Sequence, residues 1–337
     1  MAISAVNRCA ISFYAAVAML AGCGGNPPAP FANTQYAGLA TPLAAGPAGQ
    51  KPCGWLSPIA KHGRRLIYVA NGDEILIFPE RPQNPSAVGC ITTPVDSSHG
   101  IYVDRHGKLY VTNGNNTVTV YPRGSLTASA TYSTGTAGPM YPIVDRKGDL
   151  FVSTCCNGTV LEFLHGKSSP YQTLQTPGYE VDGIALDSAD NLYVAYRSSL
   201  YSGSIEEFAP GSTQGEILGM PIVQPQGLAV TSDGTIVLVQ TGPADGIYVF
   251  PPGSQTPSLK LSVGATPVQL AITEPEHKLF VSAFGWLGSG RIYDSPYPLS
   301  ASSHFHVKIV FRLRHNGHRR RHRFQIQGMA LGNAQTF

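Results

Sequence analysis

The sequence lacks the motifs that mark several well-known chemistries. It has no Gly-rich phosphate-binding loop and no nucleophile elbow, which argues against phosphate-loop nucleotide sites and against hydrolases built around an exposed serine turn. Charged residues make up only 13% of the chain, whereas Gly and Pro number 37 and 27. This composition favours a fold with many turns over one made of long helices.

The apolar run near the start of the chain, residues 9–21, is too short to span a bilayer as a helix. It has the length of a signal-peptide core, Arg8 precedes it, and Leu-Ala-Gly-Cys follows at residues 20–23. This order resembles the lipobox of bacterial lipoproteins, in which a peptidase cuts before the Cys and its thiol carries a diacylglyceryl group. The resemblance predicts a signal peptide over residues 1–22 and lipidation of Cys23. The alternative is an ordinary signal peptide or an uncleaved anchor with a chance Cys.

Residues 24–50 contain no charged side chain and are rich in Gly, Ala and Pro. Such a stretch cannot bury enough apolar surface to offset the entropy of ordering it. We therefore expect residues 23–55 to be a lipidated, flexible tether that holds a domain, residues 56–337, at a membrane. This prediction implies that the protein is exported to the cell envelope, at the outer membrane or the periplasmic face rather than in the cytoplasm.

Four cysteines lie beyond the tether, at positions 53, 90, 155 and 156. Export to an oxidising compartment permits disulfides, and Cys53 with Cys90 is the predicted pair. Cys155 and Cys156 either form a vicinal bridge or remain thiols. Their spacing does not match a zinc site, which needs separated pairs of Cys or His.

A repeat of about 42 residues runs through the domain. Short runs of β-branched and aromatic residues recur at regular intervals, and their aligned positions are 68, 110, 151, 193, 237 and 280. Each run is preceded by an inner strand and a tight turn and followed by a third strand that ends in an aromatic residue. Repeats of this length and type predict the blades of a β-propeller.

The strand count predicts how the ring closes. Inner strands begin at about 101, 142, 184, 228, 270 and 329, so the run at 66 has none before it and the strand at 329 has no run after it. We expect an all-β, six-bladed propeller with four antiparallel strands per blade, in which the C-terminal strand joins the N-terminal blade. The alternative is a degenerate inner strand at residues 58–60 and a truncated seventh blade.

The unit Gly-Ile-x-Val-Asp-x-x-Gly-x-Leu-Tyr-Val-x-Asn, as in residues 100–113, resembles the NHL repeat and its six-bladed, TolB-like relatives. These include the regucalcin–gluconolactonase family and the streptogramin lyases. The resemblance covers about residues 60–331 and implies the fold, but this fold carries enzymes and binding proteins alike. The recurring Asp104, Asp145 and Asp187 are interpreted as caps of the turn after the inner strand.

The resemblance implies that a ligand would bind at the mouth of the central channel. The side chains expected on this rim precede the inner strands or end the second strands, and they are His99, Tyr141, Asp182, Gln226, Gln327, Asn71, Asn113 and Tyr196. Relatives hold a divalent metal with several oxygen ligands, including carboxylates, but this rim has one carboxylate. Neither a metal, a cofactor nor a catalytic residue is therefore expected.

These observations favour a non-catalytic binding or scaffold module attached to a membrane through its lipid. Its ligand would be an unidentified protein, peptide or carbohydrate, while nucleic acid is not expected in this compartment. The alternative is a metal-dependent lactonase or lyase with its site at the channel mouth.

Residues 304–323 differ in composition from the rest of the domain. They hold seven of the chain's 23 Lys and Arg residues and five of its ten His residues. This segment is either a hairpin that binds an anionic surface, a solvated insertion, or a locally frame-shifted stretch. Residues 307–311 within it alternate as a half-buried strand does.

Overall fold

The computed structural model describes residues 53–62, 65–135, 137–273, 277–284, 289–312 and 328–333, with the backbone alone for residues 312 and 328–333. The predicted lipobox with Cys23 and residues 24–52 of the predicted tether lie outside the described residues, as do Gln327 and residues 313–323 of the basic segment. The described residues, from Cys53 to Asn333, belong to one compact unit. Among the described residues, no helix has the length and apolar character needed to cross a membrane.

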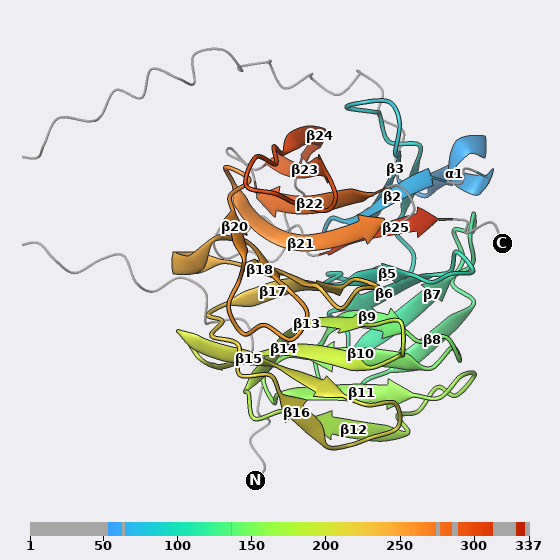
Figure 1. The fold of residues 1–337 in the computed structure, drawn as a ribbon. Coiled ribbons are helices and arrows are strands. Elements are labelled where there is room, and N and C mark those ends of the chain that lie inside the picture. Colours follow the sequence, from blue (N-terminus) through green and yellow to red (C-terminus); the bar gives the residue numbers. More distant parts are fainter. Residues whose placement is uncertain are drawn as a thin grey trace, which may run out of the picture. The chain divides into compact units, whose positions relative to one another are not determined.

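Six antiparallel sheets form the blades of a propeller, as the repeat predicted (Figure 1). The second blade contains β5 (Ile101–Val103), β6 (Leu109–Asn113), β7 (Thr117–Tyr121) and β8 (Ala130–Ser133). The third contains β9 (Pro139–Val144), β10 (Leu150–Thr154), β11 (Thr159–Phe163) and β12 (Gln172–Gln175). The fourth, which we call the hairpin blade, contains β13 (Glu180–Leu186), β14 (Leu192–Ser199), β15 (Ser202–Phe208) and β16 (Gly215–Ile217).

The last two sequential blades follow the same order. The fifth contains β17 (Pro225–Val230), β18 (Ile236–Gln240), β19 (Gly246–Phe250) and β20 (Leu259–Leu261), with a 3-10 turn, η1, at Gly242–Ala244. The sixth contains β21 (Thr266–Thr273), β22 (Lys278–Phe284), β23 (Ser289–Pro296) and β24 (His306–Arg312). The strand expected within the basic segment is therefore β24, the outer strand of the sixth blade.

The remaining sheet joins the two ends of the domain, and we call it the closing blade. It contains β25 (Gly328–Asn333), β2 (Arg65–Ala70), β3 (Ile75–Pro79), β4 (Gly89–Ile91) and an additional edge strand, β1 (Trp55–Leu56). The inner strand β25 pairs with β2 from Arg65 opposite Asn333 to Ala70 opposite Gly328. Residues 58–60 begin a short helix, α1 (Pro58–His62), so they form no inner strand and the six-bladed prediction is confirmed.

The inner strands contact one another around a closed ring, β5–β9–β13–β17–β21–β25 and back to β5. Glycines at the start of these strands allow the close approach. A Cβ on Gly183 would lie 2.4 Å from the Gln226 carbonyl oxygen, and one on Gly100 would lie 2.3 Å from that of Met140. The Gly of the repeat is thus required because backbones of neighbouring blades meet near the axis.

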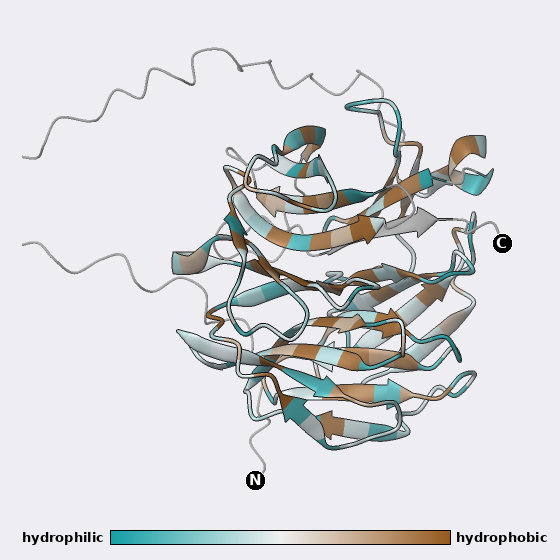
Figure 2. Ribbon diagram, viewed as in Figure 1, coloured by the Kyte–Doolittle hydropathy of each residue, from teal (hydrophilic) through white to brown (hydrophobic). Residues whose placement is uncertain are grey.

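Apolar side chains fill the interfaces between neighbouring blades. Six clusters of buried residues each combine side chains from two adjacent sheets, including both interfaces of the closing blade. Figure 2 shows the hydrophobic residues along the strands. The turns after the inner strands are capped as expected, since the Asp104 Oδ1 accepts hydrogen bonds from the amides of His106 and Lys108.

The strand directions define two faces of the ring. The connections into the inner strands and those between second and third strands lie on one face, which we call the mouth. The turns after the inner strands and helix α1 lie on the other face. In Figure 1 the β14–β15 hairpin and α1 mark these two sides.

Candidate functional site

The mouth is shaped by β-bulges in the inner strands. The register between inner and second strands shifts in the third, hairpin, fifth and sixth blades. In the hairpin blade the extra residue is Asp182, between the pairs Val181–Tyr196 and Gly183–Ala195. A bulge leaves its extra residue outside the ladder and redirects its side chain. Several of the predicted rim positions, among them Tyr141, Asp182 and Gln226, therefore lie where the strands bend.

Two predicted rim residues hydrogen-bond within their own blades. The Asn71 Nδ2 donates to the Glu74 Oε1 at 2.9 Å within the β2–β3 turn. The Asn113 Oδ1 accepts the amide of Asp96 at 3.1 Å, while its Nδ2 donates to the Thr119 Oγ1 at 3.1 Å. Both side chains are fully buried. They shape the mouth connections, and the structure does not bring them together around a ligand.

A buried group of three charges lies at the mouth end of the hairpin blade. The Arg197 Nε donates to the Asp182 Oδ2 at 2.8 Å, and its Nη2 pairs with the Glu180 Oε2. The side chains of Arg197 and Asp182 are each 2% exposed and that of Glu180 is 14% exposed, so solvent reaches the group through Glu180. The ring of Tyr179, which is partly exposed, lies 5.7 Å from the guanidinium carbon.

This group holds two carboxyls against one guanidinium, and its protonation reflects that excess. Burial raises the pKa of Asp182 to about 8, with repulsion from Glu180 adding to the rise and Arg197 opposing it. Burial also raises the pKa of Glu180. A proton shared between the two carboxyls at neutral pH removes the uncompensated charge. The group then offers both hydrogen-bond donors and acceptors at one edge of the mouth.

Two predicted rim tyrosines lie in one apolar cluster between the third blade and the hairpin blade. Tyr141, from β9 of the neighbouring blade, is buried, and burial together with the charges of Asp182 and Glu180 raises its pKa. Tyr196, buried in the same apolar cluster, pairs with Val181 in the ladder. Burial also raises the pKa of Tyr196, so both phenols stay protonated. The structure brings Tyr141 together with Tyr196 in this cluster and places Tyr141 within the influence of Asp182.

The remaining rim predictions have separate surroundings. His99 is half-buried, its Nδ1 has no hydrogen-bond partner among the described residues, and burial lowers its pKa against the attraction of Asp96. It lies in the connection from β4 into β5 and directly precedes Gly100, which lies against the backbone of Met140. Gln226 is half-buried at the bulge of β17. Gln327 lies outside the described residues.

Arg197 and Glu180 were not predicted. The second strand was expected to end near Tyr196, but β14 continues to Ser199 and places Arg197 opposite Glu180 in the ladder. The Glu-x-Asp spacing of residues 180–182 was a usable signal, because alternate residues of a strand share a face. The position of the bulge decides whether these carboxyls meet the arginine, and no residue pattern showed that position.

The described residues do not fit the divalent metal that the resemblance implies. Asp182 is paired with Arg197, and the two Asn side chains are bonded within separate blades. One described trio, Cys53, Glu74 and Cys90, has potential ligand atoms within 4.8 Å of one another, but its two cysteines form a disulfide. Neither set provides the several free oxygen ligands that a hard cation requires.

The cysteines divide into two environments. Cys53 and Cys90 are joined by a disulfide that fastens β1 to β4. Cys155 is a free thiol at the mouth, with its Sγ 2.8 Å from that of Cys156. Burial raises the pKa of Cys155, and the carboxylates of Glu180 and Asp182 raise it further. Its thiol is therefore protonated and poorly suited to act as a nucleophile.

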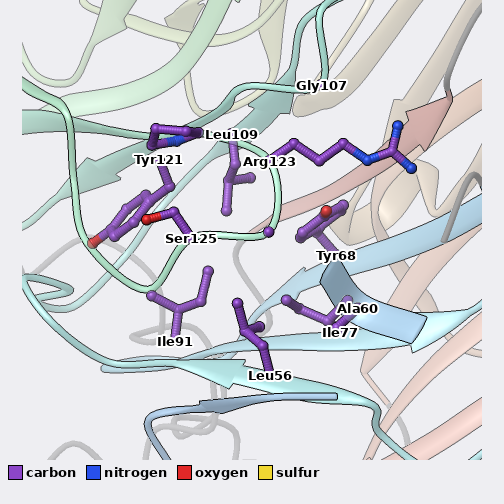
Figure 3. A pocket seen from close by; sticks show the side chains of 12 residues that line it. Leu56, Ala60, Tyr68, Ile77, Ile91, Gly107, Leu109, Tyr121, Arg123 and Ser125 are labelled. Atoms are coloured by element: carbon purple, nitrogen blue, oxygen red, sulfur yellow. The ribbon is translucent and has the colours of Figure 1, made fainter. Parts of the chain in front are cut away.

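A small cavity lies between the closing and second blades, on the face opposite the mouth. Figure 3 shows Leu56, Ile77 and Tyr68 on one side and Leu109 and Arg123 on the other. The cavity volume of about 10 Å³ is room for one water molecule. It is too small for an organic substrate.

Comparison with known proteins supports the fold. No family model and no curated protein matches the chain. A crystal structure of a protein of unknown function from Bacteroides caccae matches with a TM-score of 0.60 and 10% identity, covering 80% of this chain and 99% of that one. A selenomethionine-substituted virginiamycin B lyase from Staphylococcus aureus matches with a TM-score of 0.47 and 11% identity, covering 72% and 87%. At these identities the likeness concerns the fold alone.

Proposed function

We propose that the chain is an exported, lipid-anchored β-propeller of the NHL-like kind that acts as a binding or scaffold module, with its ligand at the mouth. The anchor is supported by residues 20–23, Leu-Ala-Gly-Cys, after an apolar run of signal-peptide length. Replacement of Cys23 by Ser should abolish incorporation of labelled acyl chains and release the protein from the membrane fraction. Acyl labelling that persists in the Cys23→Ser variant would overturn the anchor.

One observation carries the non-catalytic part of the proposal. The best-placed polar side chains of the mouth already satisfy one another: Asp182 pairs with Arg197, Asn71 with Glu74, and Asn113 with its own blade. Such a surface can present fixed hydrogen-bonding groups to a ligand, and none of these described side chains is left free to act as a carboxylate base or to bind a metal. Metal analysis of the purified chain should find no stoichiometric divalent ion. One ion per chain, lost on Asp182→Ala, would contradict the proposal.

The rival function is that of a lactonase or lyase, and His99 is the observation in its favour. A neutral imidazole whose Nδ1 has no hydrogen-bond partner among the described residues suits a general base. If the chain opened lactone or cyclic depsipeptide substrates and His99→Ala removed that activity while leaving thermal stability unchanged, the enzymatic function would replace the binding one.

A further inference from the structure

The β14–β15 hairpin presents two large apolar side chains to solvent at its tip. Leu200 is 52% exposed and Tyr201 is 67% exposed. Among the described connections between second and third strands, no other exposes a large apolar side chain. The tip projects on the side away from α1 (Figure 1), and the partly exposed Tyr179 lies on the same face of the same blade.

Several polar backbone groups at this tip have hydrogen-bond partners within the domain. The Tyr201 amide donates to the Ser199 Oγ at 3.2 Å, and the Leu200 carbonyl accepts the Gln224 Nε2 at 3.3 Å. The ladder continues to the pair Ser199–Ser202. A loop whose polar groups are paired in this way loses little when it leaves water. The tip is therefore apolar at its end, and part of its backbone is already hydrogen-bonded before it enters a medium of low polarity.

No charged side chain of the hairpin opposes the transfer of its tip from water into a less polar medium. Residues 198–205 contain no charged side chain, and Arg197 at the base of the hairpin is buried against Asp182 and Glu180. A surface for nucleic acid or another polyanion would expose basic residues here instead. An aliphatic residue beside a tyrosine suits the headgroup region of a bilayer, where an apolar body and a polar hydroxyl are both accommodated.

The described part of the domain begins on this same face. In the closing blade, Trp55 pairs with Cys90 and Leu56 with Gly89, so β1 runs away from the mouth and Cys53 lies at its mouth end. Cys53 is bonded to Cys90, whose Sγ lies 3.6 Å from the Glu74 Oε2 in the β2–β3 mouth connection. Cys53, the first described residue, and the apolar hairpin tip thus share one face of the ring.

We propose that the hairpin tip inserts Leu200 and Tyr201 into the headgroup region of the membrane that holds the anchor, which turns the mouth toward the bilayer. This inference rests on the proposed lipid anchor. Anchoring by one attachment alone leaves a domain free to tumble, whereas a second, weak contact fixes its orientation. A ligand of the mouth would then be met at the membrane surface.

The test places a tryptophan at the tip of the full-length chain. Tyr201→Trp and, as the matched control, Tyr171→Trp are expressed in a bacterial host and reconstituted into phosphatidylethanolamine–phosphatidylglycerol vesicles with brominated acyl chains. Tyr171 is 62% exposed at the start of β12 on the opposite face, so the two probes differ in face rather than in exposure. The emission of the parent chain is subtracted from each.

We expect the probe of the Tyr201→Trp variant to emit at shorter wavelength in vesicles and to be quenched by bromine several-fold more than the probe of the Tyr171→Trp variant. Equal quenching of the two probes, or none, in acyl-labelled protein would overturn the inserted hairpin and leave the anchor standing. Quenching of the hairpin probe without acylation of Cys23 would overturn the anchor instead. In a third variant, Leu200→Ser and Tyr201→Ser are added to the Tyr179→Trp background, and quenching of this neighbouring probe should fall because the tip no longer holds this face at the membrane.

Discussion

The closing blade and the hairpin blade use the same strand order but bury different chemistry. In the closing blade the second strand is apolar and fully buried beyond its first residue, a disulfide ties the outer edge, and the inner strand comes from the other end of the domain. In the hairpin blade the second strand runs on into Arg197, which is buried with two carboxyls.

The difference separates stabilising contacts from contacts that need another explanation. Apolar burial and a covalent closure both favour the folded ring. A buried ion group must offset the desolvation of each charge, and apolar residues of similar volume often serve stability as well or better. Clusters of this kind with shifted pKa values are found preferentially at functional sites. Under the proposed binding function, we therefore expect the closing blade to serve stability and the mouth of the hairpin blade to serve recognition.

The largest expected effect comes from removing the cation of the hairpin blade. Arg197→Met leaves Asp182 and Glu180 buried without a positive partner, and we expect it to lower the free energy of unfolding by about 3–5 kcal/mol in urea titrations. Arg197→Lys keeps a positive charge and should lose less. If both variants were as stable as the wild type within error, the three charges would not interact as described.

The closing blade should show the next largest effect. Replacing both Cys53 and Cys90 by Ser removes a disulfide between residues 37 apart in sequence. We expect a loss of about 2–4 kcal/mol, because the unfolded chain gains freedom without the cross-link. Cys155→Ser, which changes a free thiol, is the control and should leave the melting temperature nearly unchanged. If Cys155→Ser lowered the stability as much as the double replacement of Cys53 and Cys90, the disulfide of the closing blade would have no special stabilising role.

The pH dependence of stability tests the protonation of the hairpin blade. Because the pKa of Asp182 is raised to about 8, the folded chain holds a proton that the unfolded chain, with a pKa of about 3.9, has released. This stabilisation is complete below about pH 4 and is lost as the pH rises through 8. Relative to Asp182→Asn, the wild type should lose about 1–3 kcal/mol between about pH 5 and 8.5.

A matched variant isolates this proton. Asp187→Asn removes an Asp from the turn after the same inner strand, where the Oδ1 accepts the amides of Ala189 and Asn191 and where Asn can also accept. Its stability should follow the wild-type pH curve. Parallel curves for the wild type and Asp182→Asn would show that Asp182 titrates normally.

The smallest effect is expected from an exposed ion pair beside the hairpin blade. Arg146 in the third blade contacts Asp190 at 2.9 Å, but its side chain is 61% exposed. Solvent and salt screen such a pair, so Arg146→Met should change stability by at most about 1 kcal/mol. A loss as large as that of Arg197→Met would mean that burial does not distinguish the two arginines.

The sequence predicted the ring because its repeat is a property of local patterning. The spacing of the aromatic and β-branched runs, and the unpaired strand near residue 329, together determine the blade number and the closure. The arrangement of side chains at the mouth was harder to predict from the sequence. Asn71 and Asn113 were expected to face a ligand, but their partners, Glu74 and Asp96, are set by turn geometry. Arg197 was missed because its burial depends on where one bulge falls.

The most direct test of this account removes all three charges of the hairpin blade together. In a variant with Glu180→Met, Asp182→Leu and Arg197→Met, no charge is left unpaired, so we expect a free energy of unfolding within about 1 kcal/mol of the wild type or above it. That result would show that the ring does not depend on the three charges for its stability. A loss as large as that of Arg197→Met alone would show that the cluster is structural and would contradict the assignment of recognition to this blade.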